Sequence, residues 1–407
     1  DKYVKAGLLK NNNKEIIVNL KEVNRLIDKV TLDVDKSVNY KLRLWLDLKD
    51  ITDEEKEALV GQKIFLALKI NGIQNMENIT IATDKLIALT NNKDNSGLYT
   101  ITHAKDTTLQ IGNDKDITEY RYRGASPKNY VTFNNEVWRI IGVFPTDDGT
   151  GNIENRVKLI RDQSIGNKSW DNGTTAYNYT KNDNLMLLQA KNKSKVEYLE
   201  KSNEYDVIGL AKPEATPFSN NWTTATLNAE LNTTYLNSLD STSKSMIGNT
   251  KYYLGGYNGF VSGQGYTQTS VQMYSYERKI KNTTSNEFYY GTNPNSWTGK
   301  LTLMYVSDYG YASSNCENKM LYSSSSSTGD LRACNSTNWL YNIKANEWLL
   351  PQRTCVSDRA FLVLSDGNVY DDVVSHQFAA RPVLYLTSSA KITGGSGTSS
   401  SPYTLGL

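Results

Sequence analysis

Residues 130–144, YVTFNNEVWRIIGVF, decide the fold of the larger part of this chain. The first four residues are typical of a strand, the pair Asn134 and Asn135 is typical of a tight turn, and the apolar run that follows indicates a second, deeply buried strand. A turn at residues 147–149 (DDG) leads into a further strand expected at residues 156–161. The sequence therefore predicts consecutive antiparallel strands between residues 130 and 161.

Helices are expected after these strands. Apolar residues recur every four positions and indicate one helix face: Leu227, Leu231, Tyr235 and Leu239. Thr223 or Thr224 is the expected cap of this helix, and a shorter helix is expected at residues 241–247. Late strands are expected at residues 359–364, 369–374 and 380–386. Early strands, one or two helices, long loops and late strands together predict a β-rich α+β fold.

The N-terminal part shows a separate strand pattern. Tyr40, Leu42, Leu44 and Leu46 alternate with polar residues, which indicates a strand with one buried face. Further strands are expected at residues 15–20 and 63–70, and a helix with acidic residues in its first turn at residues 52–59. The predicted organisation is a partial β-sandwich at 1–75, a linker or small β unit at 76–117 and a larger domain at 118–407. Strand candidates in the middle segment are residues 78–89 and 97–103.

Composition excludes several functional classes. The 407 residues carry 45 Lys and Arg against 43 Asp and Glu, which argues against binding to nucleic acid through a basic surface. Two histidines and three cysteines without paired C-x-x-C spacing argue against a zinc site. No apolar run reaches the roughly 18 residues that a membrane-spanning helix needs. We expect no metal and no cofactor.

Tyrosine (27) greatly outnumbers phenylalanine (8), and this composition is typical of many secreted bacterial proteins with polar, β-rich surfaces. The sequence begins at Asp1 without a methionine, so we expect that a leader segment was removed. The expected location is extracellular, at the cell surface or in a matrix.

Two resemblances to known families refine this reading. "YKLRLWLD", an acidic turn and "VGQKIFLALKINGIQ" resemble the end of TasA/camelysin-like β-sandwich domains of Gram-positive bacteria, over about residues 10–75. Members of that family decorate cells or form extracellular fibres, some by lending a strand to the next subunit. This resemblance implies a structural subunit as the alternative function.

The second resemblance covers about residues 120–407. It is carried in order by "YRGASPKNYVTFNNEVWRIIGVF", "VKLIRDQSIGNKSWD", "NNWTTATLNAELNTTYLNSL", "YYLGGY", "SWTGKLTLMYVSDYGYA", "CNSTNWLY" and "AARPVLYLTSSAKITGGSGTSSSPYTL". These pieces resemble an uncharacterised C-type-lectin-like module of secreted gut Firmicute proteins, similar in shape to sulfatase-modifying-factor domains. Such a fold pairs its first and last strands, which would bring residues 138–144 close to residues 381–386. The resemblance implies a fold and a location but no established activity.

The cysteines predict one disulfide. Cys316 and Cys334 bracket a Ser-rich loop of seventeen residues, and closing such a loop stabilises a fold by about 3 kcal/mol. Cys334 with Cys355 is the second possibility, and three reduced thiols are the third.

The sequence lacks the motifs that mark calcium-dependent sugar binding and common catalytic sites. Neither a Glu-Pro-Asn or Gln-Pro-Asp loop nor a Trp-Asn-Asp strand is present, so calcium-dependent sugar binding is not expected. Nucleophile elbows, P-loops and dinucleotide-binding turns are absent as well, and we expect that the protein is not an enzyme.

Aromatic residues offer large, rigid contact surfaces with polar tips, which suits recognition of a protein or a glycan. The candidate ligand-binding residues are Trp297, Tyr305, Asp308, Tyr309, Tyr311, Trp339, Trp348, Arg353 and Asp358. For each of them, packing in the core is the competing and more frequent role. The sequence thus predicts a secreted adhesin or binding protein with a calcium-independent, C-type-lectin-like recognition face for a surface glycan or protein.

Overall fold

The computed structural model divides the chain into two compact units, Asp1–Asn78 and Ile79–Leu407. The structure describes residues 4–10, 14–19, 40–46, 49, 51–60, 81–173, 218–257, 268–280, 293–321, 334–354 and 356–407. No helix among these residues is long and apolar enough to cross a membrane.

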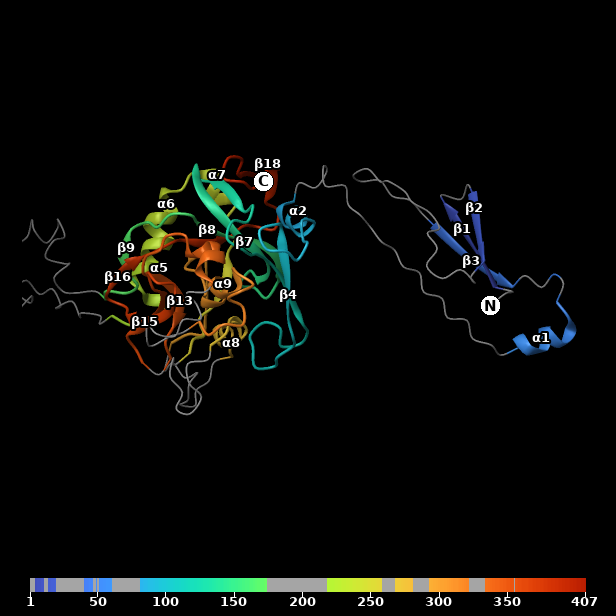
Figure 1. Cartoon of the computed structure of the whole chain (residues 1–407), viewed down its shortest axis with the longest axis horizontal. Coiled ribbons are helices and arrows are strands. Elements are labelled where there is room, and N and C mark those ends of the chain that lie inside the picture. Colours follow the sequence, from blue (N-terminus) through green and yellow to red (C-terminus); the bar gives the residue numbers. More distant parts are fainter. Residues whose placement is uncertain are drawn as a thin grey trace, which may run out of the picture. The chain divides into compact units, whose positions relative to one another are not determined.

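The first unit contains one described sheet and one helix (Figure 1). Its antiparallel strands are β1 (Val4–Lys10), β2 (Lys14–Asn19) and β3 (Tyr40–Leu46), in the order β2-β1-β3. β2 and β3 confirm two predicted strands, whereas β1 was not expected. Helix α1 (Asp53–Leu59) begins at Thr52, whose side chain forms a reciprocal capping box with Glu55. The strand expected at residues 63–70 lies outside the described residues.

The second unit is β-rich with few helices, as predicted. Its strands are β4 (Leu98–His103), β5 (Ile117–Tyr122), β6 (Tyr130–Phe133), β7 (Glu136–Asp147), β8 (Ile153–Arg161), β9 (Asn167–Ser169), β10 (Thr250–Tyr253), β11 (Ser296–Gly299), β12 (Leu301–Thr302), β13 (Glu347–Gln352), β14 (Arg359–Val363), β15 (Val369–Val373), β16 (Gln377–Ala379), β17 (Val383–Tyr385), β18 (Lys391–Gly394) and β19 (Tyr403–Gly406). Its helical segments are α2 (Ala82–Ile87), η3 (Trp222–Thr224), α5 (Thr226–Glu230), η4 (Leu231–Tyr235), α6 (Leu236–Ser238), α7 (Ser241–Ser245), α8 (Ser270–Glu277), α9 (Val306–Tyr311), η5 (Asn335–Thr337) and η6 (Trp339–Tyr341).

The long strand β7 organises the largest sheet, which runs in the order β12-β17-β8-β7-β6-β19-β18 and also includes β4 and β5. The predicted turn before β7 is confirmed, because Asn134 and Asn135 both have positive φ (53° and 57°). β7 pairs with β6 near its start and with β5 at Gly142 and Val143. A Cβ at Gly142 would lie 2.0 Å from the carbonyl oxygen of Tyr120, so glycine is required for β5 to approach.

The two ends of the second unit lie in this sheet, but their pairing differs from the prediction. β17 pairs with β8, so β8 separates residues 381–386 from β7. The two segments still touch, since the rings of Phe144 and Tyr385 have centroids 6.0 Å apart. The last strand, β19, instead pairs in parallel with β6.

A second sheet, in the order β15-β14-β13-β16-β9, shares a hydrophobic core with the first. Trp138 from β7 and Trp348 from β13 are both fully buried in this core. In Figure 1, α5 and α6 lie on the side of the unit opposite β4. One core therefore joins strands from residue 98 to residue 403.

Two local predictions were wrong. Residues 82–87, inside the strand expected at 78–89, form helix α2, whose Ala82 and Leu86 pack in the core. Neither Thr223 nor Thr224 caps α5. The first backbone N–H of α5, on Thr226, donates to the carboxylate of Asp171 (3.0 Å), a residue far away in sequence. Tertiary contacts, rather than local propensity, thus determine the structure of residues 82–87 and the capping of α5.

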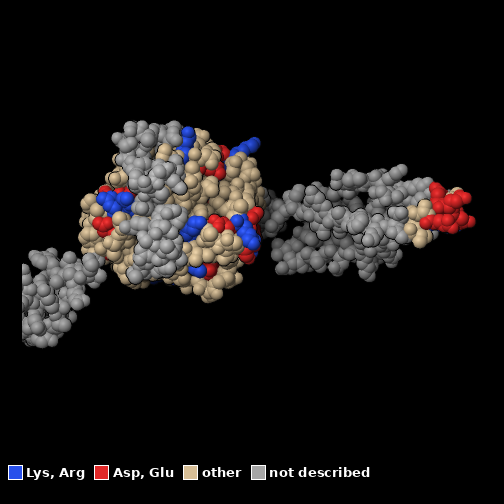
Figure 2. All heavy atoms as spheres, turned by 90° about the horizontal axis from the view of Figure 1, so that it is seen from below, with Lys and Arg blue, Asp and Glu red and all other residues tan. Residues whose placement is uncertain are grey.

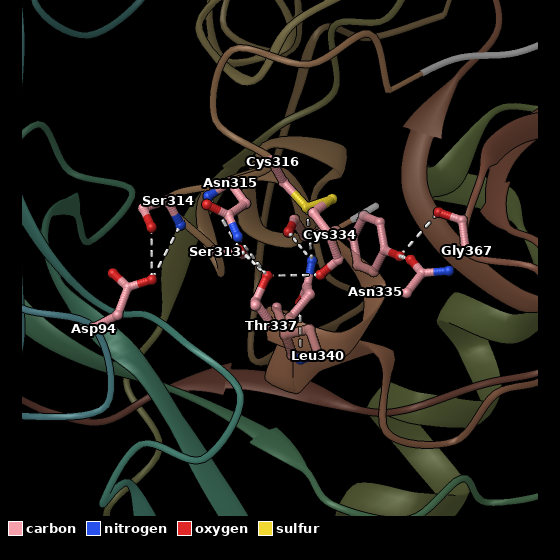
Figure 3. Close-up of a disulfide and its surroundings, with 12 residues drawn as sticks. Asp94, Ser313, Ser314, Asn315, Cys316, Cys334, Asn335, Thr337, Leu340 and Gly367 are labelled. Carbon is pink, nitrogen blue, oxygen red and sulfur yellow. Dashed lines mark hydrogen bonds between the residues drawn. A yellow bond between two sulfur atoms is a disulfide. The ribbon is translucent and has the colours of Figure 1, made fainter. Parts of the chain in front are cut away.

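The disulfide is formed by Cys316 and Cys334, the pairing predicted first (Figure 3). Hydrogen bonds surround it: the hydroxyls of Ser313 and Thr337 are 2.8 Å apart, and the Ser314 hydroxyl donates to Asp94 at 2.7 Å. The third cysteine, Cys355, lies outside the described residues. The bond therefore fixes the segment after α9 to the start of η5.

Candidate functional site

A small pocket with tyrosine-rich walls is the strongest candidate site. It is lined by Ile111, Ile117, Glu119, Phe144, Pro145, Thr146, Lys251, Tyr252, Tyr253, Tyr274, Arg278, Tyr305 and Tyr385, and we call it the tyrosine pocket. Its free volume is about 20 Å³, enough for a water molecule or one small chemical group. Pro145 and Lys251 are its half-buried residues and mark the side that opens to solvent, because the other lining residues are buried.

Arg278, at the end of α8, supplies hydrogen-bond donors to the pocket. Its Nη1 donates to the carbonyl of Tyr274 (3.1 Å) and to Oε2 of Glu277 (2.8 Å). The guanidinium lies over the ring of Tyr274, 3.7 Å from its centroid. Among the described residues, Nε and Nη2 of Arg278 donate to no acceptor. One edge of the guanidinium is therefore fixed by the protein, and the other is free for a ligand.

Glu119, on β5, supplies an acceptor to the same pocket. Its Oε1 accepts from Nε of Arg121 (2.5 Å) and lies 3.0 Å from Nε2 of His103. Burial alone would raise the pKa of Glu119, but Arg121 and His103 outweigh burial and hold this pKa well below its usual range. The side chain is therefore a carboxylate at neutral pH. Within the described part of the chain, Oε2 of Glu119 accepts no hydrogen bond.

Further buried ion pairs hold Arg121, the partner of Glu119, in place. Nη1 of Arg121 donates to Oδ1 of Asp308 (2.9 Å), and Nζ of Lys158 bonds the other oxygen of the same carboxylate. Burial lowers the pKa of Lys158 to about 8, although Asp308 opposes the shift. We call the full set of seven ionisable residues the charge cluster: His103, Glu119, Arg121, Lys158, Glu277, Arg278 and Asp308.

The charge cluster joins five elements of the second unit, with His103 coming from β4. Glu119 and Arg121 come from β5, Lys158 from β8, Arg278 from the end of α8 and Asp308 from α9. Local sequence explains both helix starts: Thr269 forms a capping box with Gln272 before α8, and the Asp308 carboxylate accepts from the backbone N–H of Tyr305 (2.9 Å). Contacts from several elements of the second unit therefore hold the pocket walls in place without a ligand.

The structure brings four of the nine predicted site residues to this region. Tyr305 lines the tyrosine pocket, and Asp308 belongs to the charge cluster. Trp297 packs on Tyr252, with ring centroids 5.8 Å apart. Tyr311 lies beneath the guanidinium of Arg121, 5.0 Å from the ring centroid. Three of the four are buried, and Trp297 is partly exposed.

The other five lie elsewhere. Tyr309, Trp339 and Trp348 are buried, and each donates a hydrogen bond to a backbone carbonyl, those of Gly367, Tyr122 and Lys168 respectively. Arg353 is half-buried and pairs with Asp371 (2.8 Å). Asp358 is half-buried, and its carbonyl accepts from Val374.

Burial favours packing over ligand contact for most of these residues. Tyr305, Asp308, Tyr309, Tyr311, Trp339 and Trp348 are each at most 3% exposed. Tyr305 alone among the six combines burial with a place in the pocket wall. A direct ligand-binding role stays a prediction for all nine residues.

Several polar residues that define the site were not predicted from the sequence. Glu119, Arg121 and Arg123 alternate along a β-rich segment, and all three are buried. Alternating charges on the apolar side of a strand are unusual, because a buried charge is costly unless it is paired. That pattern was the available signal for Glu119 and Arg121. Lys158 and Arg278 carried no comparable signal.

Within the described residues, no group of three or more His, Cys, Asp or Glu side chains is arranged to hold a metal ion. The site thus consists of tyrosine rings, one guanidinium edge and one carboxylate oxygen.

No protein-family model, curated protein or solved structure matches this chain.

Proposed function

We propose that this chain is an extracellular recognition protein of a cell surface or matrix, whose second unit binds a surface glycan or protein without calcium and without catalysing a reaction. The tyrosine pocket carries the proposal. Tyrosine rings and an arginine are the side chains that most often dominate binding energy in recognition sites. The C-type-lectin-like assignment of residues 118–407 is part of the proposal and is supported by the sheet that contains both the early and the late strands of the second unit.

The charge cluster supports binding rather than chemistry. Each of its carboxylates is already engaged: Glu119 with Arg121, Glu277 with Arg278, and Asp308 with Arg121 and Lys158. A general acid or base needs a proton that it can exchange with a substrate, and the ion pairs oppose such exchange. Pre-formed walls instead reduce the entropy lost when a ligand binds.

The disulfide supports the extracellular location. Disulfides persist in oxidising compartments and are rare where thiols are kept reduced. Cys316 and Cys334 are both buried, and the bond between them crosses the base of a long loop.

The test is binding of the purified full chain to glycan arrays and to bacterial and host cell surfaces, with and without a chelator. Two variants, Lys251→Trp and Lys128→Trp, form a matched pair. The first adds a ring where the pocket opens, whereas the second adds a ring at an exposed position outside the pocket lining. We expect binding that the chelator leaves unchanged, that Lys251→Trp abolishes and that Lys128→Trp retains. Blank arrays and cells, or loss of binding on chelation, would contradict the proposal.

The alternative is a fibre subunit assembled by β-strand donation. In the first unit, β1 pairs with β2 on one side and with β3 on the other. Residues 4–10 therefore have no open edge to offer to a second copy, and the alternative has less support. Sedimentation of the full chain distinguishes the two functions: a stable monomer at high concentration favours recognition, and concentration-dependent polymers favour the fibre.

A further inference from the structure

The tyrosine pocket presents a donor and an acceptor that both lack a partner among the described residues. Nε and Nη2 of Arg278 are the donors, and Oε2 of Glu119 is the acceptor. Both residues are at least nine-tenths buried and line the pocket, and these atoms are not among the fully enclosed ones, so a group that enters the pocket can reach them. A ligand group that donates and accepts at once would satisfy both.

The charge balance argues against an ionic ligand. The charge cluster contains three carboxylates and three cations at neutral pH, besides His103. Where the pocket opens, Nζ of Lys251 lies 3.6 Å from Oδ2 of Asp147, which balances that side as well. Positive and negative side chains are also interspersed on the face of the second unit in Figure 2. An anion or cation in the pocket would be a buried charge without a counter-charge, which is strongly unfavourable.

A hydroxyl group fits this balance. It offers one donor and two acceptor lone pairs and carries no charge. The free volume of about 20 Å³ admits one such group and not a whole sugar ring. The rest of the ligand would therefore stay at the open side, near Pro145 and Lys251.

We propose that the tyrosine pocket binds a hydroxyl group of a neutral glycan, with Arg278 donating a hydrogen bond to the hydroxyl oxygen and the Glu119 carboxylate accepting a hydrogen bond from the hydroxyl. This inference rests on the proposed recognition function and narrows its ligand to an uncharged, hydroxyl-rich polymer. Tyr253, Tyr274 and Tyr305 form the walls, and apolar walls with a few placed polar groups are typical of small-ligand sites.

The experiment compares neutral and acidic polysaccharides. Dextran, mannan and galactan serve as the neutral probes, and heparin and polygalacturonate as the acidic ones. The full chain is tested by affinity electrophoresis and calorimetry at low and high salt. We expect binding to at least one neutral probe, none to the acidic probes, and an affinity that changes less than about threefold with salt, because no ion pair forms.

Variants locate the site. Arg278→Lys keeps the charge but loses the planar set of donors, and we expect affinity to fall about tenfold or more. Lys251→Trp tests the same pocket from its exposed side and does not touch the charge cluster. Lys128→Trp, at an exposed position outside the pocket lining, is its control. Near-ultraviolet circular dichroism checks that each variant is folded.

The outcomes separate the two proposals. If the chain binds only acidic polysaccharides or a protein, or binds with strong salt dependence, the hydroxyl inference is overturned and the recognition function stands. If a neutral glycan binds equally well to Lys251→Trp and to the unchanged protein, the pocket is not its site and the inference is again overturned. If no glycan, protein or cell surface is bound, both proposals fail.

Discussion

Replacing Asp308 with asparagine tests the charge cluster directly. The Asp308 carboxylate holds Arg121 (2.9 Å) and Lys158, and all three side chains are at most 1% exposed. Removing this anion leaves two cations in the interior, and breaking a buried pair in this way costs about 3–5 kcal/mol of unfolding free energy. For a unit of this size, 1 kcal/mol corresponds to roughly 1.5 °C, so we expect the melting temperature to fall by about 5–7 °C.

The loss of unfolding free energy in Asp308→Asn should depend on pH, because Lys158 titrates in the folded protein. Burial already lowers the pKa of Lys158 to about 8, and loss of Asp308 should lower it further. An unfolded lysine titrates at about pH 10, so above its folded pKa the folded protein binds fewer protons than the unfolded chain and becomes more stable as pH rises. In the unchanged protein this gain begins near pH 8, and in the variant it begins lower. The difference in stability should therefore narrow by about 1 kcal/mol between pH 7 and pH 9.

Guanidinium unfolding followed by tryptophan fluorescence measures this effect, because six of the seven tryptophans lie after residue 78. Asp114→Asn, at an exposed position, is the matched control and should change stability by less than about 0.5 kcal/mol. An Asp308→Asn variant within about 1 kcal/mol of the unchanged protein at pH 7 would refute the reasoning. So would a difference that widens as pH rises.

Three further predictions concern stability. The folded pKa of Glu119 is held below its usual range, so its contribution to the free energy of unfolding is present above about pH 4.3 and is lost as pH falls further. In urea unfolding, the stability difference between Glu119→Gln and the unchanged protein should therefore shrink between pH 5 and pH 3. A constant difference would contradict this. Gly142→Ala places a Cβ 2.0 Å from the carbonyl of Tyr120 and should cost about 1–3 kcal/mol in thermal unfolding; a neutral result would mean that β5 is not held against β7. Replacing Cys316 and Cys334 with serine should cost about 3 kcal/mol in guanidinium unfolding, and an unchanged midpoint would show that the bond contributes nothing.

Strong local patterns predicted much of the fold. The turn at Asn134 and Asn135, the strands on either side of it and the pairing of Cys316 with Cys334 all depend on signals within a short stretch of sequence. The apolar face from Leu227 to Leu239 was also found, although its middle is π-helical rather than α-helical. Each of these features is fixed by backbone preference or by apolar spacing.

What the sequence did not reveal depends on distant partners. The cap on α5 comes from Asp171, and the place of β8 between β7 and β17 depends on strands that meet only in the folded unit. The pairing of Lys158 with Asp308 was not predicted for the same reason, because the two residues are 150 positions apart. Aromatic residues were chosen because they suit recognition, but most of those chosen had the apolar surface that a core requires.

The walls of the tyrosine pocket come from almost the whole length of the second unit, from Ile111 to Tyr385. Tyr385 belongs to β17, which must pair with β8 before that wall exists. A nascent chain whose β17 is still inside the ribosome therefore carries an unfinished pocket, whatever its earlier strands have done. A product that stops before β17 would lack this wall and, with it, the complete pocket.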